Sequence, residues 1–115
     1  MGTINHNAII ATTWKETEVE RIIKWINKLG DYEKGLFLIS RKQINDYVTV
    51  TMIPDGSKEG WDDSNYGDDL RSQFVNELQK ALYKDGSSPW DWIEVSFGEY
   101  GQKIVQGNCE ATPPF

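Results

Sequence analysis

The stretch that decides the fold is AIIATTW at residues 8–14, a short apolar and β-branched run. It predicts a strand, and because apolar and polar residues hardly alternate in it, we expect both faces to be buried near the centre of a sheet. Residues 16–30 then predict an amphipathic helix that Thr17 caps and Gly30 ends. Its apolar residues recur at helical spacing: Val19, Ile22, Ile23, Ile26 and Leu29.

The next two segments predict a β-hairpin. Residues 36–44 and 47–53 have the composition of strands, and Asn45 and Asp46 between them tolerate positive φ, as a two-residue turn requires. Pro54 ends the second strand because proline has no amide hydrogen to donate to a neighbouring strand.

The second half of the chain predicts another helix and two further strands. Apolar residues at spacings of three and four predict a helix over residues 68–82, with Asp68 and Asp69 in its first turn. Strict alternation predicts a strand over residues 92–97 that is exposed on one side, and a short last strand is expected around residues 103–105. One face of the strand at 92–97 carries its apolar residues, Ile93, Val95 and Phe97.

This order of elements predicts an α+β fold, a ferredoxin-like two-layer sandwich with an extra edge strand. Two helices would cover one face of an antiparallel sheet, and another two-layer α+β topology is the alternative. Residues 1–107 form the single expected domain, and residues 108–115 a loose tail. Because the hairpin is apolar in both registers, we expect a second copy of the chain to cover the other face of the sheet, unless its strands are central and already covered.

The composition limits the possible partners and compartments. The chain has 115 residues, 12 basic and 18 acidic, with a net charge of −6. An excess of acid disfavours sequence-independent binding to nucleic acid or to an anionic membrane. A single cysteine, Cys109, fits a reducing compartment, and the sequence has neither an apolar run of membrane-spanning length nor a secretory signal at its start, so we expect a cytoplasmic protein.

The acidic residues are concentrated in one segment. Residues 1–54 hold seven basic and six acidic residues, whereas residues 55–115 hold five basic and twelve acidic ones. Six of these carboxylates fall in the segment from Asp55 to Asp69, in which Lys58 is the only basic residue. The spacing does not suit a Ca²⁺ loop, because glycine and lysine stand where ligands are needed. An acidic surface for a basic partner is the functional hypothesis, and an ordinary solvated loop is the alternative.

A short pattern occurs twice in the second half. Asp-Gly-Ser at residues 55–57 is followed by Trp61, and Asp-Gly-Ser at residues 85–87 is followed by Trp90. The two loops could bind a ligand or partner, with tryptophan as a stacking face. Alternatively, Asp-Gly supplies only turn geometry and each tryptophan packs back on the sandwich edge.

Catalytic constellations are missing from the sequence. His6 is the only histidine, Cys109 has no neighbouring base, and Ser57, Ser87 and Ser88 lie in no nucleophile motif. We therefore expect no enzyme activity, no cofactor and no metal.

Three blocks carry a resemblance to known sequences. They are HNAII at residues 6–10, PDGSKEGW at residues 54–61 and DGSSPWDWIEV at residues 85–95. With these blocks the chain resembles a group of small uncharacterised proteins encoded by bacteriophages and mobile elements. The resemblance implies a context in which small acidic proteins bind components of host defence, and it carries over no site residues.

The leading hypothesis is a non-enzymatic, phage-type binding protein that inhibits a basic host defence or nucleic-acid-binding protein. Its expected contact residues are acidic or aromatic: Asp55, Glu59, Trp61, Asp62, Asp63, Asp68, Asp69 and Trp90. One alternative is an oligomeric module that sequesters a nucleotide signal, with Arg71 and Lys84 holding phosphate. The other alternative is a structural component of a phage particle.

Overall fold

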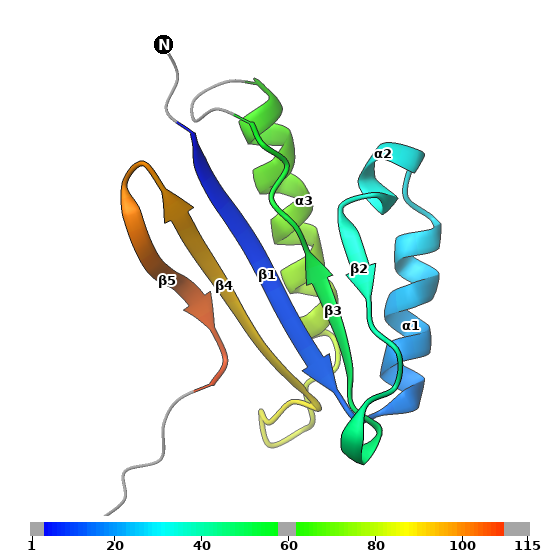
Figure 1. The fold of residues 1–115 in the computed structure, drawn as a ribbon. Helices are drawn as coiled ribbons and strands as arrows, with labels where there is room; N and C mark the ends of the chain where they lie inside the picture. The colour runs from blue at the N-terminus through cyan, green and yellow to red at the C-terminus, as the bar shows by residue number, and fades with distance from the viewer. Residues whose placement is uncertain (1–3, 58–61, 110–115) are drawn as a thin grey trace, which may run out of the picture.

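The computed structural model describes residues 4–57 and 62–109, in which five strands form one antiparallel sheet of order β2-β3-β1-β4-β5 (Figure 1). The strands are β1 (Asn5–Thr13), β2 (Phe37–Ile39), β3 (Val48–Met52), β4 (Trp90–Gly98) and β5 (Gly101–Gly107). The helices are α1 (Glu16–Asn27), the short α2 (Asp31–Lys34) and α3 (Asp62–Gln79). The predicted α+β class is confirmed.

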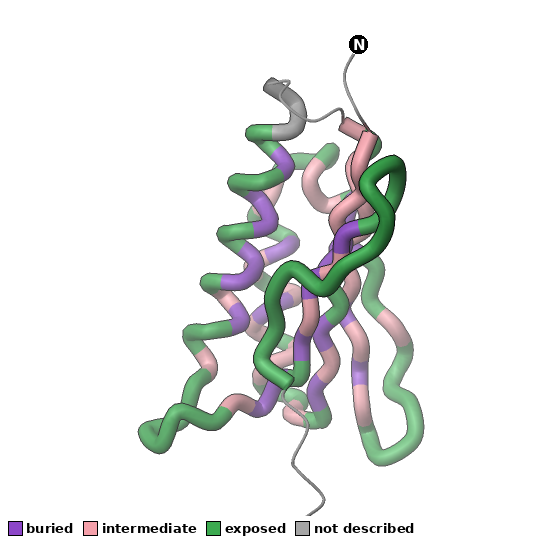
Figure 2. Tube along the Cα trace, turned by 90° about the vertical axis from the view of Figure 1, so that its left-hand side faces the viewer, coloured by how far each residue is buried: buried purple, intermediate pink, exposed green. Residues whose placement is uncertain are grey.

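The first strand, β1, lies at the centre of the sheet, as its sequence predicts. Ala11 pairs with Val50 of β3 on one side and with Trp92 of β4 on the other. Burial on both faces was a wrong prediction, because Ile10 is 42% exposed while its neighbours Ile9 and Ala11 are fully buried. The helices cover only one side of the sheet, so alternate residues of β1 meet either the core or the uncovered face (Figure 2).

The core lies between the sheet and helices α1 and α3. Trp25 of α1 stacks on Phe74 of α3 with ring centroids 5.9 Å apart, and Phe37 of β2 meets both rings edge-on. Such aromatic pairs add to the stabilisation that comes from burying apolar area. This cluster therefore holds the two helices and the short edge strand together.

Both long helices begin at earlier residues than the sequence predicted. Thr17 lies inside α1 and does not cap it, since Lys15 is the N-cap residue and has no capping side-chain bond. Helix α3 begins at Asp62, six residues before the predicted start. Asp68 and Asp69 consequently lie in its second turn, where the helix dipole contributes little to their stability.

The predicted hairpin is confirmed, but its first strand is shorter, and the predicted two-residue turn is wrong because the chain reverses through a three-residue 3₁₀ turn, Ile44–Asp46. Asn45 and Asp46 have φ of 59° and 65° in the turn between β2 and β3, the conformation for which these residue types are suited. Regular pairing in β2 ends at Ile39, although the Ser40 amide still donates to the Thr49 carbonyl at 2.9 Å. The helical turn α2 was not predicted.

Strand β4 has the predicted alternation, but it turns Ile93, Val95 and Phe97 away from the helices. Trp92, Glu94 and Ser96 are buried on the helix side, so the set at 93, 95 and 97 lies on the uncovered face. Glu94 is tolerated there because its carboxylate accepts hydrogen bonds from Asn7 Nδ2 at 3.0 Å and Gln106 Nε2 at 2.8 Å.

The last strand, β5, is exposed along its whole length at the edge of the sheet (Figure 2). After it, Asn108 is tied to β4: its amide donates to the Trp92 carbonyl, its side chain donates to the Trp90 carbonyl, and its Oδ1 accepts from the Trp92 amide. Asn108, the first residue of the predicted tail, is therefore held against β4. None of the helices in the described part of the chain is long and apolar enough to cross a membrane.

Candidate functional site

The two Asp-Gly-Ser segments form the same turn. At residues 55–57 the aspartate Oδ1 accepts hydrogen bonds from the serine amide at 3.0 Å and the serine hydroxyl at 2.8 Å. At residues 85–87 the corresponding distances are 3.0 and 2.7 Å. The central glycines have φ of 78° and 87°, a conformation in which other residues are strained. The repeated sequence therefore encodes a repeated local structure.

The two turns do not form one site. The first precedes α3 and the second follows it, and this helix of 18 residues spans roughly 27 Å. Figure 1 shows the corresponding connections at opposite ends of the sandwich. Any site built on one turn is therefore independent of the other.

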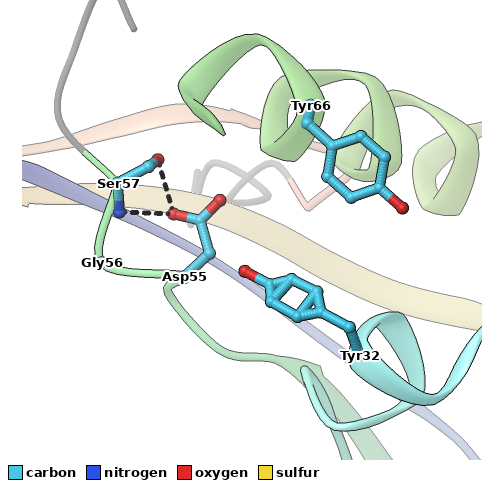
Figure 3. A pocket seen from close by; sticks show the side chains of 5 residues that line it. All are labelled: Tyr32, Asp55, Gly56, Ser57 and Tyr66. Carbon is cyan, nitrogen blue, oxygen red and sulfur yellow. Dashed lines mark hydrogen bonds between the residues drawn. The ribbon is translucent and has the colours of Figure 1, made fainter. Parts of the chain in front are cut away.

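The turn at residues 55–57 forms one wall of a pocket of about 500 Å³ (Figure 3). Its other lining residues are Tyr32 from α2 and Tyr66 from α3, and we call it the tyrosine pocket. The two rings have their centroids 6.4 Å apart and are tilted by 40°. The pocket thus combines two aromatic surfaces with the carboxylate of Asp55.

A hydrogen bond fixes one of these rings. The Tyr66 hydroxyl donates to the carboxylate of Glu33, which links α3 to α2. This bond lowers the pKa of Glu33 and raises the pKa of Tyr66. Glu33 therefore stays ionised and Tyr66 stays protonated around neutral pH, so the link persists there.

Asp55 lies directly against α3 at Gly67. A Cβ atom at position 67 would come within 2.1 Å of Asp55 Oδ2 and 3.3 Å of a guanidinium nitrogen of Arg71. Glycine is therefore required for this close approach. The buried Arg71 lies close to Asp55 at this point and is ion-paired with Asp68.

A smaller hollow of about 160 Å³ shares Tyr66 with the tyrosine pocket. It adds the carboxylates of Glu33 and Asp69 to the same end of the molecule. The remaining lining residues are Leu29, Gly30, Leu70 and Gln73. The acidic residues are thus spread over two neighbouring concave surfaces. We call these surfaces, together with the first turn of α3 in which Asp62 and Asp63 stand, the acidic end.

The structure distributes the predicted contact residues over several places. Asp55 lines the tyrosine pocket, Asp69 lines the hollow, and Asp68 is engaged with Arg71. Asp62 and Asp63 begin α3, but their side chains are outside the described part, as are Glu59 and Trp61 altogether.

Sequence reasoning missed Tyr32, Glu33 and Tyr66. Tyr66 stands within the acidic segment itself, a signal that could have suggested an aromatic contact there. Tyr32 and Glu33 are 34 and 33 positions before Tyr66, so only the tertiary fold shows that they belong to this site.

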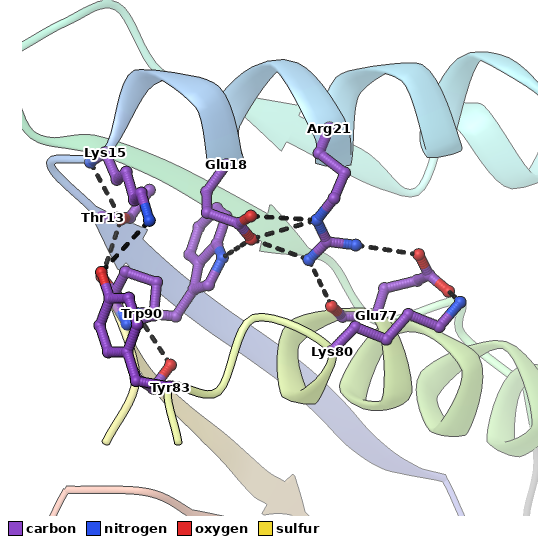
Figure 4. Close-up of polar contacts among 10 residues, drawn as sticks. Thr13, Lys15, Glu18, Arg21, Glu77, Lys80, Tyr83 and Trp90 are labelled. Atoms are coloured by element: carbon purple, nitrogen blue, oxygen red, sulfur yellow. Dashed lines mark hydrogen bonds and ion pairs between the residues drawn. The ribbon is translucent and has the colours of Figure 1, made fainter. Parts of the chain in front are cut away.

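Trp90 requires a correction, because it is fully buried and cannot be a surface anchor. Its indole N–H donates to Glu18 Oε1 at 3.0 Å, and Glu18 is ion-paired with Arg21 at 2.8 Å (Figure 4). Arg21 also reaches Glu77 of α3, 3.2 Å away. This network joins β4, α1 and α3, which is a structural role.

The pKa of Glu18 reflects this environment. Burial alone would raise it, but the hydrogen bonds from Arg21 and Trp90 and the positive charges of Arg21 and Lys15 outweigh burial. The net effect lowers the pKa, so the carboxylate is held in its charged form.

The uncovered face of the sheet is a second candidate surface. Apolar side chains from four strands lie on it: Ile10, Leu38, Ile93, Val95, Phe97 and Ile104. Several of them are well exposed, Ile104 by 69% and Leu38 by 59%. We call this surface the open sheet face.

Other chemistry has little basis in the described residues. No group of three or more His, Cys, Asp or Glu side chains in residues 4–57 and 65–109 is placed to hold a metal ion. Arg71 is paired and buried, and neither it nor Lys84 lines the tyrosine pocket, so the two do not form a phosphate site there. Comparisons with family models, curated proteins and solved structures gave no match to this chain.

Proposed function

We propose that this protein is a non-enzymatic binding protein that captures a basic partner protein at its acidic end. The observation that carries the proposal is the tyrosine pocket, in which two exposed aromatic rings and a carboxylate share one concave surface. Together with the resemblance to phage-encoded proteins, it favours a host defence protein as the partner, bound and inhibited in the host cytoplasm.

Two physical effects support this function. The chain carries a net charge of −6, and complementary charge speeds association and selects among partners. Binding energy in protein interfaces is usually concentrated in a few aromatic and arginine contacts surrounded by a polar rim. The acidic end has both components.

The test distinguishes an effect of where the negative charges lie from an effect of the net charge of the protein. The probe is a nona-arginine peptide, and its affinity is measured by calorimetry at a fixed salt concentration. We expect Asp62→Lys/Asp63→Lys to weaken binding about tenfold. The control Glu16→Lys/Glu20→Lys makes the same change in net charge at exposed positions of α1 and should weaken binding much less. Equal losses in the two variants would show that only net charge matters and would contradict the proposal.

We further propose that a second copy of the chain covers the open sheet face. Side chains alternate between the two faces of each strand, and Asp91 is the one acidic residue of the described strands that lies on this face. Two copies could therefore approach each other there despite their net negative charge. The five strands, of 9, 3, 5, 9 and 7 residues, offer roughly 500 Å² of sheet area, and the protruding side chains enlarge the accessible area toward the ~800 Å² per partner of a stable dimer.

Light scattering after size-exclusion chromatography tests this assembly. We expect twice the chain mass of 13.2 kDa, and Ile10→Lys should give the monomer because it buries a charge in the interface. The control Leu82→Lys changes an exposed apolar residue beyond α3, away from that face, and should leave the dimer intact. A monomeric native protein would overturn the assembly.

We also propose the ferredoxin-like topology as the finer description of the fold. The sheet order β2-β3-β1-β4 with antiparallel neighbours supports it, as does the packing of α1 and α3 on one side of the sheet. Strand β5 would be the addition at the edge. Solution of the structure by crystallography, followed by comparison of the strand order, tests the assignment.

A further inference from the structure

We propose that the tyrosine pocket is a receptor for one arginine side chain of the partner. This inference rests on the proposed function and names the chemical group that the acidic end recognises. It combines three features of the pocket: the paired rings, the hydrogen bond that fixes one of them, and a carboxylate held in place by a turn.

The two rings offer the aromatic surface that a guanidinium group prefers. Tyr32 is 57% exposed and Tyr66 is 49% exposed, although each tyrosine has a large apolar ring. A planar cation is attracted to the face of an aromatic ring when it lies within about 6 Å of the ring centre. The centroids are 6.4 Å apart and the rings are tilted, so one guanidinium at their mouth can contact both.

The bond between Tyr66 and Glu33 strengthens this preference. A phenol that donates its proton to a carboxylate has more electron density in its ring, and the same bond restricts rotation of the side chain. The ring is therefore positioned before the ligand arrives, which reduces the entropy lost on binding. Glu33 adds a negative charge beside the ring.

Asp55 supplies the charge partner. Its Oδ1 is occupied by two hydrogen bonds from Ser57, and these fix the orientation of the carboxylate. Figure 3 shows this carboxylate in the pocket between Tyr32 and Ser57. A charge-assisted hydrogen bond from a guanidinium to a fixed carboxylate is stronger than one between neutral groups.

The lining also selects against other ligands. None of the five described lining residues is basic, and the neighbouring guanidinium of Arg71 is already ion-paired with Asp68, so a phosphate or carboxylate ligand would meet mainly negative charge in the pocket. The volume of about 500 Å³ exceeds that of one arginine side chain and leaves room for the backbone of the segment that carries it. A protein-borne arginine therefore fits better than an anionic metabolite.

The test compares N-acetyl-arginine amide with N-acetyl-citrulline amide, which has nearly the same shape without the charge. Both are titrated into the ¹⁵N-labelled full chain, and the backbone amide shifts of Gly56, Ser57 and Tyr66 are followed by NMR. We expect saturable shifts at millimolar concentrations with the arginine compound. The citrulline compound should bind at least tenfold more weakly, because it cannot make the cation–π and charge-assisted contacts.

Matched variants locate the site. Asp55→Ala and Asp85→Ala remove the same charge from the same kind of turn at opposite ends of α3, so only Asp55→Ala should lower the affinity, by about tenfold. Tyr66→Leu removes one ring at an exposed position and should weaken binding about fivefold. Equal affinities in the two aspartate variants would overturn the assignment of the pocket.

Gly67→Ala provides a variant that should remain folded. Alanine favours the helix over glycine, but its methyl group would occupy the space of Asp55 Oδ2 and displace the carboxylate. We expect an unfolding midpoint close to that of the native protein together with a several-fold loss of affinity for the arginine compound. Unchanged affinity would show that the position of Asp55 does not matter, which contradicts the inference.

The two proposals can fail separately. If nona-arginine binds at the acidic end but arginine and citrulline compounds give equal responses, the proposed function stands and the arginine receptor is wrong. If the arginine compound binds in the pocket but the Asp62→Lys/Asp63→Lys variant still binds nona-arginine normally, the receptor stands and the larger acidic contact surface is wrong.

Discussion

The turn at residues 55–57 and the turn at residues 85–87 have the same hydrogen bonds, but the first opens onto a pocket while the second leads into the core. Beside the first stand two exposed tyrosines from different helices. Shortly after the second, Trp90 enters the core and donates to Glu18. The same tripeptide therefore lies next to a binding surface at one end of α3 and next to a structural anchor at the other.

This difference separates what a short sequence determines from what the fold determines. Asp-Gly-Ser determines the turn, because glycine allows positive φ and aspartate accepts the serine protons. Whether the turn lies beside a pocket or beside the core depends on residues that are distant in the sequence, such as Tyr32 for the first turn and Glu18 for the second. A repeated motif is thus evidence for repeated geometry and not for repeated function.

The largest expected effect is on the free energy of unfolding, and it concerns Trp90, the buried residue that follows the second turn. Trp90→Ala should lower the free energy of unfolding by about 4 kcal/mol, because it removes a fully buried indole and leaves a cavity. Urea unfolding followed by circular dichroism measures the change. Trp14→Ala is the control, since Trp14 is 53% exposed and its loss should cost well under about 1 kcal/mol. Similar costs for both would show that Trp90 does not anchor the core.

A smaller effect is expected from the network that Trp90 enters. Glu18→Gln should cost about 1 kcal/mol at pH 7, because it removes the charge that Arg21 and Trp90 stabilise. The pKa of Glu18 is lowered in the folded state, so its contribution is complete above the unfolded-state pKa of about 4.3 and is lost as the pH falls through the lower folded value.

Urea midpoints at several pH values between 7 and 2.5 measure this dependence. The gap between the native protein and Glu18→Gln should close as the pH falls. A gap of constant size down to the lowest pH would mean that the charge of Glu18 contributes nothing and that only packing is lost.

The smallest effect tests whether the two turns are equivalent. Gly56→Ala and Gly86→Ala both place a side chain at positive φ in open space, so each should cost about 1 kcal/mol through backbone strain alone. Thermal unfolding of the two variants provides the comparison. A cost that differs by more than about 1 kcal/mol between them would indicate that the surroundings constrain one turn more than the other.

Sequence reasoning succeeded where the decisive interactions are local. The central strand, the two long helices and the hairpin turn at Asn45 and Asp46 follow from periodicity and turn chemistry within a few residues. The α+β class then follows from the order of these elements.

Sequence reasoning failed where packing between distant elements determines which side chains are buried. The alternation in β4 was correct, but only its pairing with β1 and β5 shows that Glu94 turns inward, where Asn7 and Gln106 hydrogen-bond to its carboxylate. Trp90 was mistaken for a surface residue for the same reason. Glu18, the partner of its indole, is 72 positions earlier in the chain.

The central position of β1 has a consequence for the time at which the protein folds. Asn5 pairs with Gly98 and Thr13 pairs with Val48, so β1 meets β3 only after a further third of the chain has been made, and β4 much later still. Ribosomes add about 5–20 residues per second, and sheets with such distant pairings close slowly. We therefore expect β1 to remain an unpaired apolar segment during much of synthesis, and the sheet to form completely only after β4 has been synthesised.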